Sequence, residues 1–141
     1  MKYAICNETF GDWSREKAFT FASECGYTGL EVAPFTLASD VTEVSSSLRD
    51  QVRGEAESAR LEIIGLHWLL AKTKGYHLTS SDASTRRSTA LYLIELAKLC
   101  RDLGGSIMVF GSPPQRNREA GLSLEAATDY AVDVLTEALP A

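Results

Sequence analysis

The segment EIIGLH, residues 62–67, is short, apolar and rich in β-branched residues, and a polar loop and a long amphipathic pattern follow it. The same order occurs three more times, with β-rich runs KYAIC at residues 2–6, TGLEVA at 28–33 and SIMVFG at 106–111. Strands that alternate with helices pack in parallel and are joined by right-handed crossovers. The sequence therefore predicts an α/β fold with a four-stranded parallel sheet and helices on one face.

The helical patterns cover residues 14–25, 43–60 and 84–103 and the segment from Ser123 onward. In each of them, apolar residues recur at the spacing of one helix face. Gly26 is expected to end the first helix and the glycine pair 104–105 the third, because glycine adopts the left-handed conformation that closes a helix. Pro140 is expected to stop the fourth helix.

Four strand–helix units are half of the number that closes a (βα)₈ barrel, a fold that takes about 200 residues or more. The chain has 141 residues, so we expect a single (βα)₄ half-barrel domain over residues 1–141. An open sheet leaves its first and fourth strands as unpaired edges. Two copies could pair these edges around a two-fold axis, and we therefore expect a homodimer or higher self-association.

Composition excludes several classes of partner. The net charge is −5, with 14 basic and 19 acidic residues, which argues against a nucleic-acid-binding surface. No apolar run approaches the roughly 20 residues that span a bilayer, and Met1-Lys2 leads directly into a strand without a signal-peptide pattern. We expect a cytoplasmic protein without membrane contact. The three cysteines show no paired spacing and are expected to be small buried residues.

Polar side chains lie at or just beyond the ends of the first three predicted strands, at Asn7, Glu8, Glu31 and His67. In parallel α/β folds the loops after the carboxyl ends of the strands build the functional site. These residues are therefore the first candidates for chemistry.

The alternation of side chains along a strand places Glu31 on the face that points away from the helices. In the third strand we predict Ile64 and Leu66 on the helix side, which leaves His67 opposite. Glu31 and His67 are then expected to meet on the inner face, where a carboxylate can orient an imidazole and hold a proton or a metal ion. The alternative is that each only satisfies a local hydrogen bond, and two ligands do not by themselves define a metal site.

Two further groups lie near the same edge of the sheet. Trp68 directly follows His67, and Ser112 follows the fourth strand in the loop GSPPQRNREAG at residues 111–121. Arg116 and Arg118 in this loop have guanidinium groups that suit a phosphate or a carboxylate. The alternative for the two arginines is an ordinary solvated loop.

Four strings then become informative together: MKYAICNETFGDW from Met1, GYTGLEVAPFTL from Gly26, EIIGLHWLLAKTKGYHLTS from Glu62 and IMVFGSPPQRN from Ile107. In this order they resemble the N-terminal half of the sugar phosphate isomerase/epimerase family, which has the xylose isomerase-like TIM barrel. The resemblance covers essentially the whole chain.

The resemblance implies a divalent metal (Mn, Mg, Co or Zn) at the carboxyl ends of the strands, with the alternative that this chain binds none. It also implies proton transfer through an enediolate of a sugar or sugar phosphate. Glu31 and His67 correspond to pocket positions of the family and become the candidate catalytic residues and metal ligands. The candidate substrate-binding residues are Asn7, Glu8, Trp68, Ser112, Arg116 and Arg118.

The resemblance also has two departures. In the sugar epimerases the principal metal ligands and both catalytic carboxylates come from strands five to eight, which have no counterpart here. His67 also resembles a metal-binding histidine of the related endonuclease branch, but that branch usually has a second histidine where this chain has Gly111-Ser112-Pro113. We therefore expect a catalytically incomplete chain, and three alternatives stay open: an enzyme completed by dimerisation, a truncated fragment that self-associates, and a non-catalytic module that binds a sugar phosphate.

Overall fold

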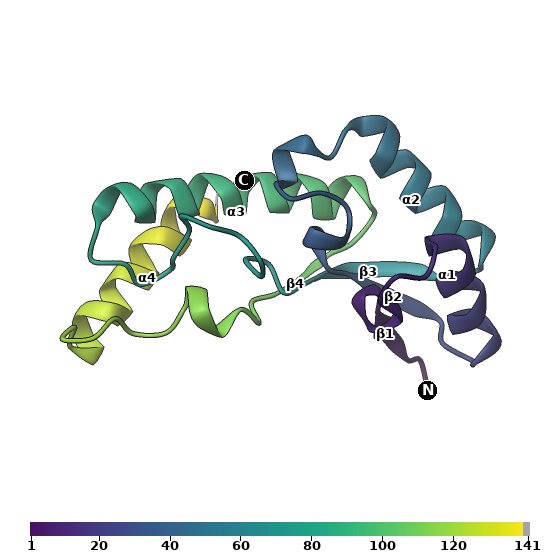
Figure 1. The fold of residues 1–141 in the computed structure, drawn as a ribbon, viewed down its shortest axis with the longest axis horizontal. Coiled ribbons are helices and arrows are strands. Elements are labelled where there is room, and N and C mark those ends of the chain that lie inside the picture. Colours follow the sequence, from purple (N-terminus) through teal and green to yellow (C-terminus); the bar gives the residue numbers. More distant parts are fainter. Residues whose placement is uncertain (140–141) are drawn as a thin grey trace.

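Four parallel strands follow one another in chain order across a single sheet in the computed structural model, which describes residues 1–139 (Figure 1). The strands are β1 (Ala4–Cys6), β2 (Gly29–Val32), β3 (Glu62–His67) and β4 (Ile107–Val109). The helices are α1 (Arg15–Glu24), α2 (Ser46–Ser58), α3 (Ala83–Asp102) and α4 (Leu124–Ala138). The predicted half-barrel with four parallel strands and four helices is confirmed.

Side-chain caps fix where the helices begin. The oxygens of Ser14, Ser45, Asp82 and Ser123 accept hydrogen bonds from backbone N–H groups in the first turns of α1 to α4. Each cap satisfies donors that a helix start would otherwise leave unpaired. Helix α2 begins later than the predicted residue 43, because residues 41–43 form a separate 3₁₀ turn. Pro140, expected to stop α4, lies outside the described residues.

The helices cover one face of the sheet and leave the other bare. Leu30, Val32 and Leu66 of β2 and β3 have no exposed surface, and they pack in one core with Phe19 of α1 and Leu96 of α3. On the opposite face, which we call the inner face, Ile107 of β4 remains 48% exposed. In residues 1–139, none of the helices has the length and apolar character needed to cross a membrane.

A register irregularity in β3 changes which side chains share the inner face. Leu30 pairs with Ile63, but Glu31 pairs with Gly65, so Ile64 is an extra residue between them. Ile63 is therefore buried beneath the helices, whereas Ile64 lies beside Gly29 on the inner face. The prediction that Ile64 shares the helix side with Leu66 is wrong, because a bulge resets the alternation of a strand.

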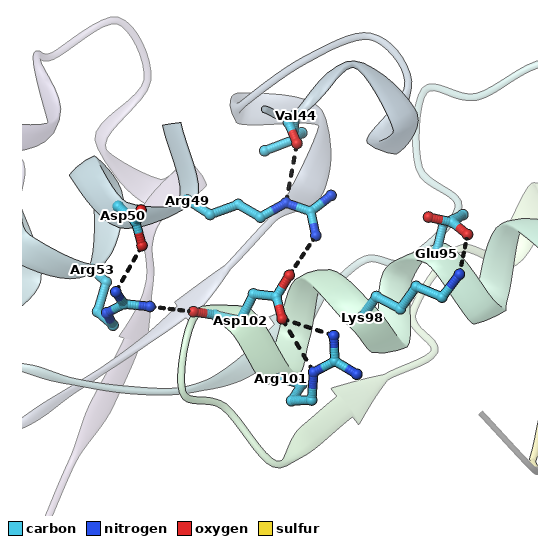
Figure 2. Close-up of polar contacts among 8 residues, drawn as sticks. All are labelled: Val44, Arg49, Asp50, Arg53, Glu95, Lys98, Arg101 and Asp102. Atoms are coloured by element: carbon cyan, nitrogen blue, oxygen red, sulfur yellow. Dashed lines mark hydrogen bonds and ion pairs between the residues drawn. The ribbon is translucent and has the colours of Figure 1, made fainter. Parts of the chain in front are cut away.

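Ion pairs join α2 to α3 on the outside of the core (Figure 2). Arg49 donates from Nη1 to Asp102 Oδ2 at 2.7 Å and from Nε to the carbonyl of Val44 at 3.0 Å. Arg53 donates to the backbone carbonyl of Asp102 at 2.7 Å. The hydrogen bond from Arg49 is the main cause that lowers the pKa of Asp102. These contacts hold α2 and α3 together, and with them the strands that each helix covers.

Candidate functional site

Glu31 and His67 lie side by side on the inner face. Glu31 is in the middle of β2, and its neighbours on both sides point into the core. His67 is the last residue of β3. The Oε2 atom of Glu31 is 3.0 Å from Nδ1 of His67, and the side chains are 23% and 27% exposed. The predicted meeting of these two residues is confirmed, whereas their chemical roles stay predictions.

The contact between them leaves a buried nitrogen free for another partner. Nδ1 of His67 is buried and makes no hydrogen bond within residues 1–139, although it lies at ion-pair distance from Glu31. The two atoms are therefore close but not aligned as donor and acceptor. A buried polar atom without a partner is rare and calls for an explanation. Since the two atoms are 3.0 Å apart, another group can reach Nδ1 only if the two side chains move apart.

Cys6 lies beside this pair but is not a nucleophile. It is opposite Glu31 in the pairing of β1 with β2. Burial raises the pKa of the Cys6 thiol, and the carboxylates of Glu8 and Glu31 act in the same direction. The thiolate is the reactive form of cysteine, so Cys6 stays a neutral thiol at pH 7. The expectation that the cysteines are small buried residues is confirmed for Cys100, whereas Cys6 is only partly buried and Cys25 is exposed. The expectation is therefore wrong for Cys25, which directly follows α1 at the surface.

Asn7 and Ser112 hold the loops that surround the pair. Asn7 Oδ1 accepts a hydrogen bond from the backbone N–H of Ala33 at 2.8 Å, and its Nδ2 donates to Thr36 Oγ1 at 2.7 Å. Ser112 is 1% exposed, and its Oγ accepts from the backbone N–H of Leu70 at 3.0 Å. Both side chains tie the end of one strand to the loop after a neighbouring strand. Substrate binding by them remains a prediction, and their present contacts lie within the protein.

A hollow of about 320 Å³ opens at the carboxyl ends of the strands. Its lining includes three of the predicted substrate-binding residues, Glu8, Trp68 and Ser112, together with Phe35, Lys72 and Gln115. Trp68 follows His67 in the left-handed conformation with φ 60°, which turns the chain sharply at the end of β3. The ring of Trp68 lies 6.0 Å from that of His67, centroid to centroid. The hollow therefore adjoins the Glu31–His67 pair.

Two residues of this hollow, Phe35 and Gln115, were missed by sequence reasoning. Phe35 lies under the Lys72 ammonium group at 4.3 Å, an arrangement that joins the loops after β2 and β3. The Oε1 atom of Gln115 is buried without a hydrogen-bond partner in residues 1–139. Their only signal in the sequence is a position in a loop after a strand end, and that signal does not show which loop side chains turn toward the site.

Arg116 and Arg118 do not join this group. Both side chains are exposed, and neither makes a hydrogen bond or ion pair through its guanidinium within the described part of the chain. Neither residue lines the hollow of 320 Å³. The predicted phosphate-binding role of the two arginines stays a prediction.

The divalent metal implied by the resemblance does not fit the side chains of this half-barrel alone. Residues 1–139 contain no group of three or more His, Cys, Asp and Glu side chains that could hold a metal ion. Glu31 and His67 supply two ligands, whereas a protein-bound divalent ion usually takes at least three from side chains. A metal at this place requires ligands from further strands.

These features define half of a parallel (βα)₈ barrel with its polar side chains gathered at the carboxyl ends of the strands. Over residues 19–141 the sequence matches the family described as xylose isomerase-like TIM barrel, and the chain belongs to this family. A search of curated proteins gives no match.

Solved structures of sugar epimerases share this fold. D-Psicose 3-epimerase from Clostridium cellulolyticum H10, solved with D-tagatose, matches with a TM-score of 0.69 and 13% identity over 99% of this chain and 48% of that chain. A D-psicose 3-epimerase in the presence of D-fructose matches with a TM-score of 0.69 and 15% identity over 99% and 49% of the two chains. 3-Keto-D-glucoside 4-epimerase from E. coli matches with a TM-score of 0.65 and 15% identity over 96% of this chain and 49% of that chain. The chain spans about half the length of these structures.

Proposed function

We propose that this chain provides one half of the sugar-binding site of a barrel isomerase or epimerase. The observation that carries the proposal is the contact of Glu31 with the unpartnered Nδ1 of His67 on the inner face. Family membership supports a sugar or sugar phosphate as the ligand. The likeness to epimerases whose structures were solved with D-tagatose and D-fructose makes ketohexoses the first ligands to test.

Each residue of the proposed site contributes a different kind of contact to the sugar. The Glu31 carboxylate accepts a hydrogen bond from a sugar hydroxyl, and His67, whose Nδ1 lies 3.0 Å from Oε2 of Glu31, holds that carboxylate in place. Trp68, which is 38% exposed, offers an aromatic surface to the apolar face of the sugar ring. Gln115 lines the hollow, and its buried Oε1 has no hydrogen-bond partner in residues 1–139. A few convergent polar groups beside aromatic walls are typical of small-molecule sites.

Turnover requires more than this half supplies. Moving a proton next to a sugar carbonyl needs a base within hydrogen-bond reach of that proton and a stabiliser for the enediolate oxygen. A bound divalent metal would supply that stabilisation, and its ligands and the second carboxylate would come from four further strand–helix units. In this chain Glu31 and His67 bind and orient the sugar.

Calorimetric titration of the chain with D-psicose, D-fructose and D-tagatose tests the proposal. We expect weak binding, with a dissociation constant on the order of 1 mM because only half of the site is present. Glu31→Gln and His67→Ala should each weaken binding about tenfold, the loss of one hydrogen bond. Glu62→Gln is the matched control, since Glu62 is exposed at the opposite end of β3. Equal binding by all variants would refute the site.

Proton exchange at C3 of the same ketoses, measured by NMR with added Mn²⁺, tests the proposal that this half-barrel binds the sugar but does not turn it over. We expect the separate half-barrel to give no exchange above buffer. Exchange that Glu31→Gln abolishes would show a complete catalytic site within the chain and would contradict the proposal of a half-site.

Phosphorylated sugars separate a second proposal from the first. Arg116 and Arg118 have free guanidinium groups in the loop that also carries Gln115. If they bind phosphate, a ketose phosphate should bind more tightly than the plain sugar, and the double change to alanine should remove the difference. Equal affinities for both ligands would reject phosphate recognition.

A further inference from the structure

Helix α4 has an apolar surface much wider than its contact with the rest of the chain. Ala127 and Val134 lie in the buried arc, which covers about 100° of the helix circumference at 100° per residue. A second arc of about 80° adjoins it and stays exposed. Its apolar residues are Leu124, Val132, Leu135 and Leu139, which are 74%, 55%, 41% and 81% exposed. The buried and exposed arcs together span about 200°, twice the width of an ordinary core-facing stripe.

The rest of the α4 circumference is acidic. Glu125, Asp129, Asp133 and Glu137 recur every fourth residue. Glu137 forms an ion pair with Arg87 of α3, so the acidic face borders α3 on one side and solvent on the other. The exposed apolar arc, which we call the α4 ridge, carries no charged side chain. It is therefore suited to bury a second contact.

A hollow of about 710 Å³ lies at the other end of the sheet. Aromatic side chains of α1 and of the segments next to β1 and α1 dominate its lining, and we call it the β1 groove. Its aromatic residues are Tyr3, Phe10, Trp13, Phe21 and Tyr27. Trp13 and Phe21 are 42% and 45% exposed although their rings pack against each other, with 5.5 Å between the ring centroids. Such a gathering of exposed aromatic surface is typical of an interface.

We propose that the α4 ridge of a second copy of this chain occupies the β1 groove. The two surfaces cannot meet within one copy, because α4 and α1 lie at opposite ends of the molecule (Figure 1). The bare edge of β4 in one copy can add to the bare edge of β1 in another as a further parallel strand. Since α4 follows β4, this pairing carries the ridge to the groove side of β1.

Two-fold pairing of two such four-stranded sheets leaves no bare edge, whereas an open series of copies always leaves two. The chain covers 48% and 49% of the two D-psicose 3-epimerase chains, which have the barrel that eight strand–helix units close. A two-fold axis makes the same ridge-to-groove contact twice and leaves no edge strand. The resulting ring would enclose both Glu31–His67 pairs. This last point rests on the proposed function, whereas the contact between copies does not.

Sedimentation velocity of the 141-residue chain without sugar tests the contact. We expect a species of twice the 15.4 kDa of one chain. Val132→Asp on the ridge and Phe21→Asp in the groove should each raise the dissociation constant at least about thirtyfold, because a carboxylate loses its hydration in an apolar contact. Leu91→Asp is the matched control, since Leu91 is 48% exposed on α3 and outside both surfaces. A monomer at every concentration, or a dimer that Val132→Asp leaves intact, would overturn the proposal.

Disulfide trapping tests the geometry and does not depend on a destabilising change. Cys25 is exposed and lines the β1 groove, so Val132→Cys should form a cross-link between copies when oxidised glutathione is added. We expect a covalent dimer with no larger species, and its loss in the Cys25→Ser background. Leu91→Cys should give no such product. A ladder of trimers and longer oligomers would overturn the closed ring, and the absence of any cross-link would overturn the contact.

Since neither measurement uses a ligand, the dimer and the sugar site can fail separately. A monomer that still binds ketohexoses through Glu31 would leave the proposed function intact. A dimer that binds no sugar would leave the contact intact.

Discussion

Two neighbouring isoleucines of β3 should differ sharply in their contribution to stability. The bulge places Ile63 under the helices, where it is 5% exposed, and Ile64 on the inner face beside Gly29. Regular alternation along the strand would instead put Ile64 on the helix side with Leu66. Replacing each isoleucine by alanine therefore decides between the two arrangements with the same chemical change.

The expected magnitudes follow from burial. Ile63→Ala removes three carbons from a packed core, which loses about 2.5 kcal/mol of transfer free energy at about 0.8 kcal/mol per carbon. The cavity adds to this, so we expect a loss of about 3–4 kcal/mol. Ile64 is only partly buried and the surface around it can relax, so Ile64→Ala should cost about 1 kcal/mol.

Urea unfolding followed by circular dichroism measures both free energies of unfolding. The protein must be dilute enough to be monomeric, because Ile64 would face the interior of a closed ring and gain contacts there. Equal m-values for the variants would show that only stability has changed. A loss for Ile64→Ala equal to or larger than that for Ile63→Ala would refute the bulge and, with it, the positions of Glu31 and His67 relative to each other.

Further tests address the strand pairing, the loops and the charges. Gly65→Ala should lower the free energy of unfolding by at least about 3 kcal/mol or prevent folding, because the added methyl group would lie 2.7 Å from a backbone carbonyl carbon of β4. Gly54→Ala is the matched control: its methyl group would have no neighbour within 4 Å, and it should stabilise α2 by up to about 1 kcal/mol. Asn7→Ala should cost about 2 kcal/mol in urea unfolding, because it leaves the buried N–H of Ala33 without an acceptor, and a change below about 0.5 kcal/mol would show that water replaces the amide. The hydrogen bond from Arg15 of α1 lowers the pKa of Glu55 below its ordinary 4.5, so the contribution of this contact to stability is present above pH 4.5 and is lost as the pH falls through the lowered value. The free energy of unfolding should therefore fall less steeply with pH below 4.5 in Glu55→Gln than in the unchanged protein, and equal slopes for the two proteins would contradict this.

Much of the fold could be predicted from local patterns. The β-rich runs lie where the strands form, and Ser123, from which the fourth helix was expected to run, caps α4, because caps and apolar spacing act within a few residues. The meeting of Glu31 with His67 also followed from alternation and strand order. Glu31, one residue before the end of β2, and His67, the last residue of β3, both point to the inner face.

The remaining features depend on contacts between distant segments. The bulge at Ile64 depends on how β2 and β3 pair, which neither strand determines alone. Asn7 has the residue type and position of a ligand-binding side chain, but its amide bonds the chain beyond β2. Phe35 and Gln115 line the hollow because of the conformations of two loops. The spacing of apolar residues predicts helices and strands, but it does not predict how a loop folds.

The two tryptophans of the chain give the most direct measurement of the central claim, that the inner face of this half-barrel binds a sugar. Trp68 borders the Glu31–His67 pair, whereas Trp13 lies in the β1 groove, so their indole N–H signals report the two places in one NMR spectrum. During titration with D-psicose the Trp68 signal should move to saturation while that of Trp13 stays in place, and the shift should vanish in Glu31→Gln. If the Trp68 signal does not move, or both signals move alike, ketohexoses do not bind at the proposed site.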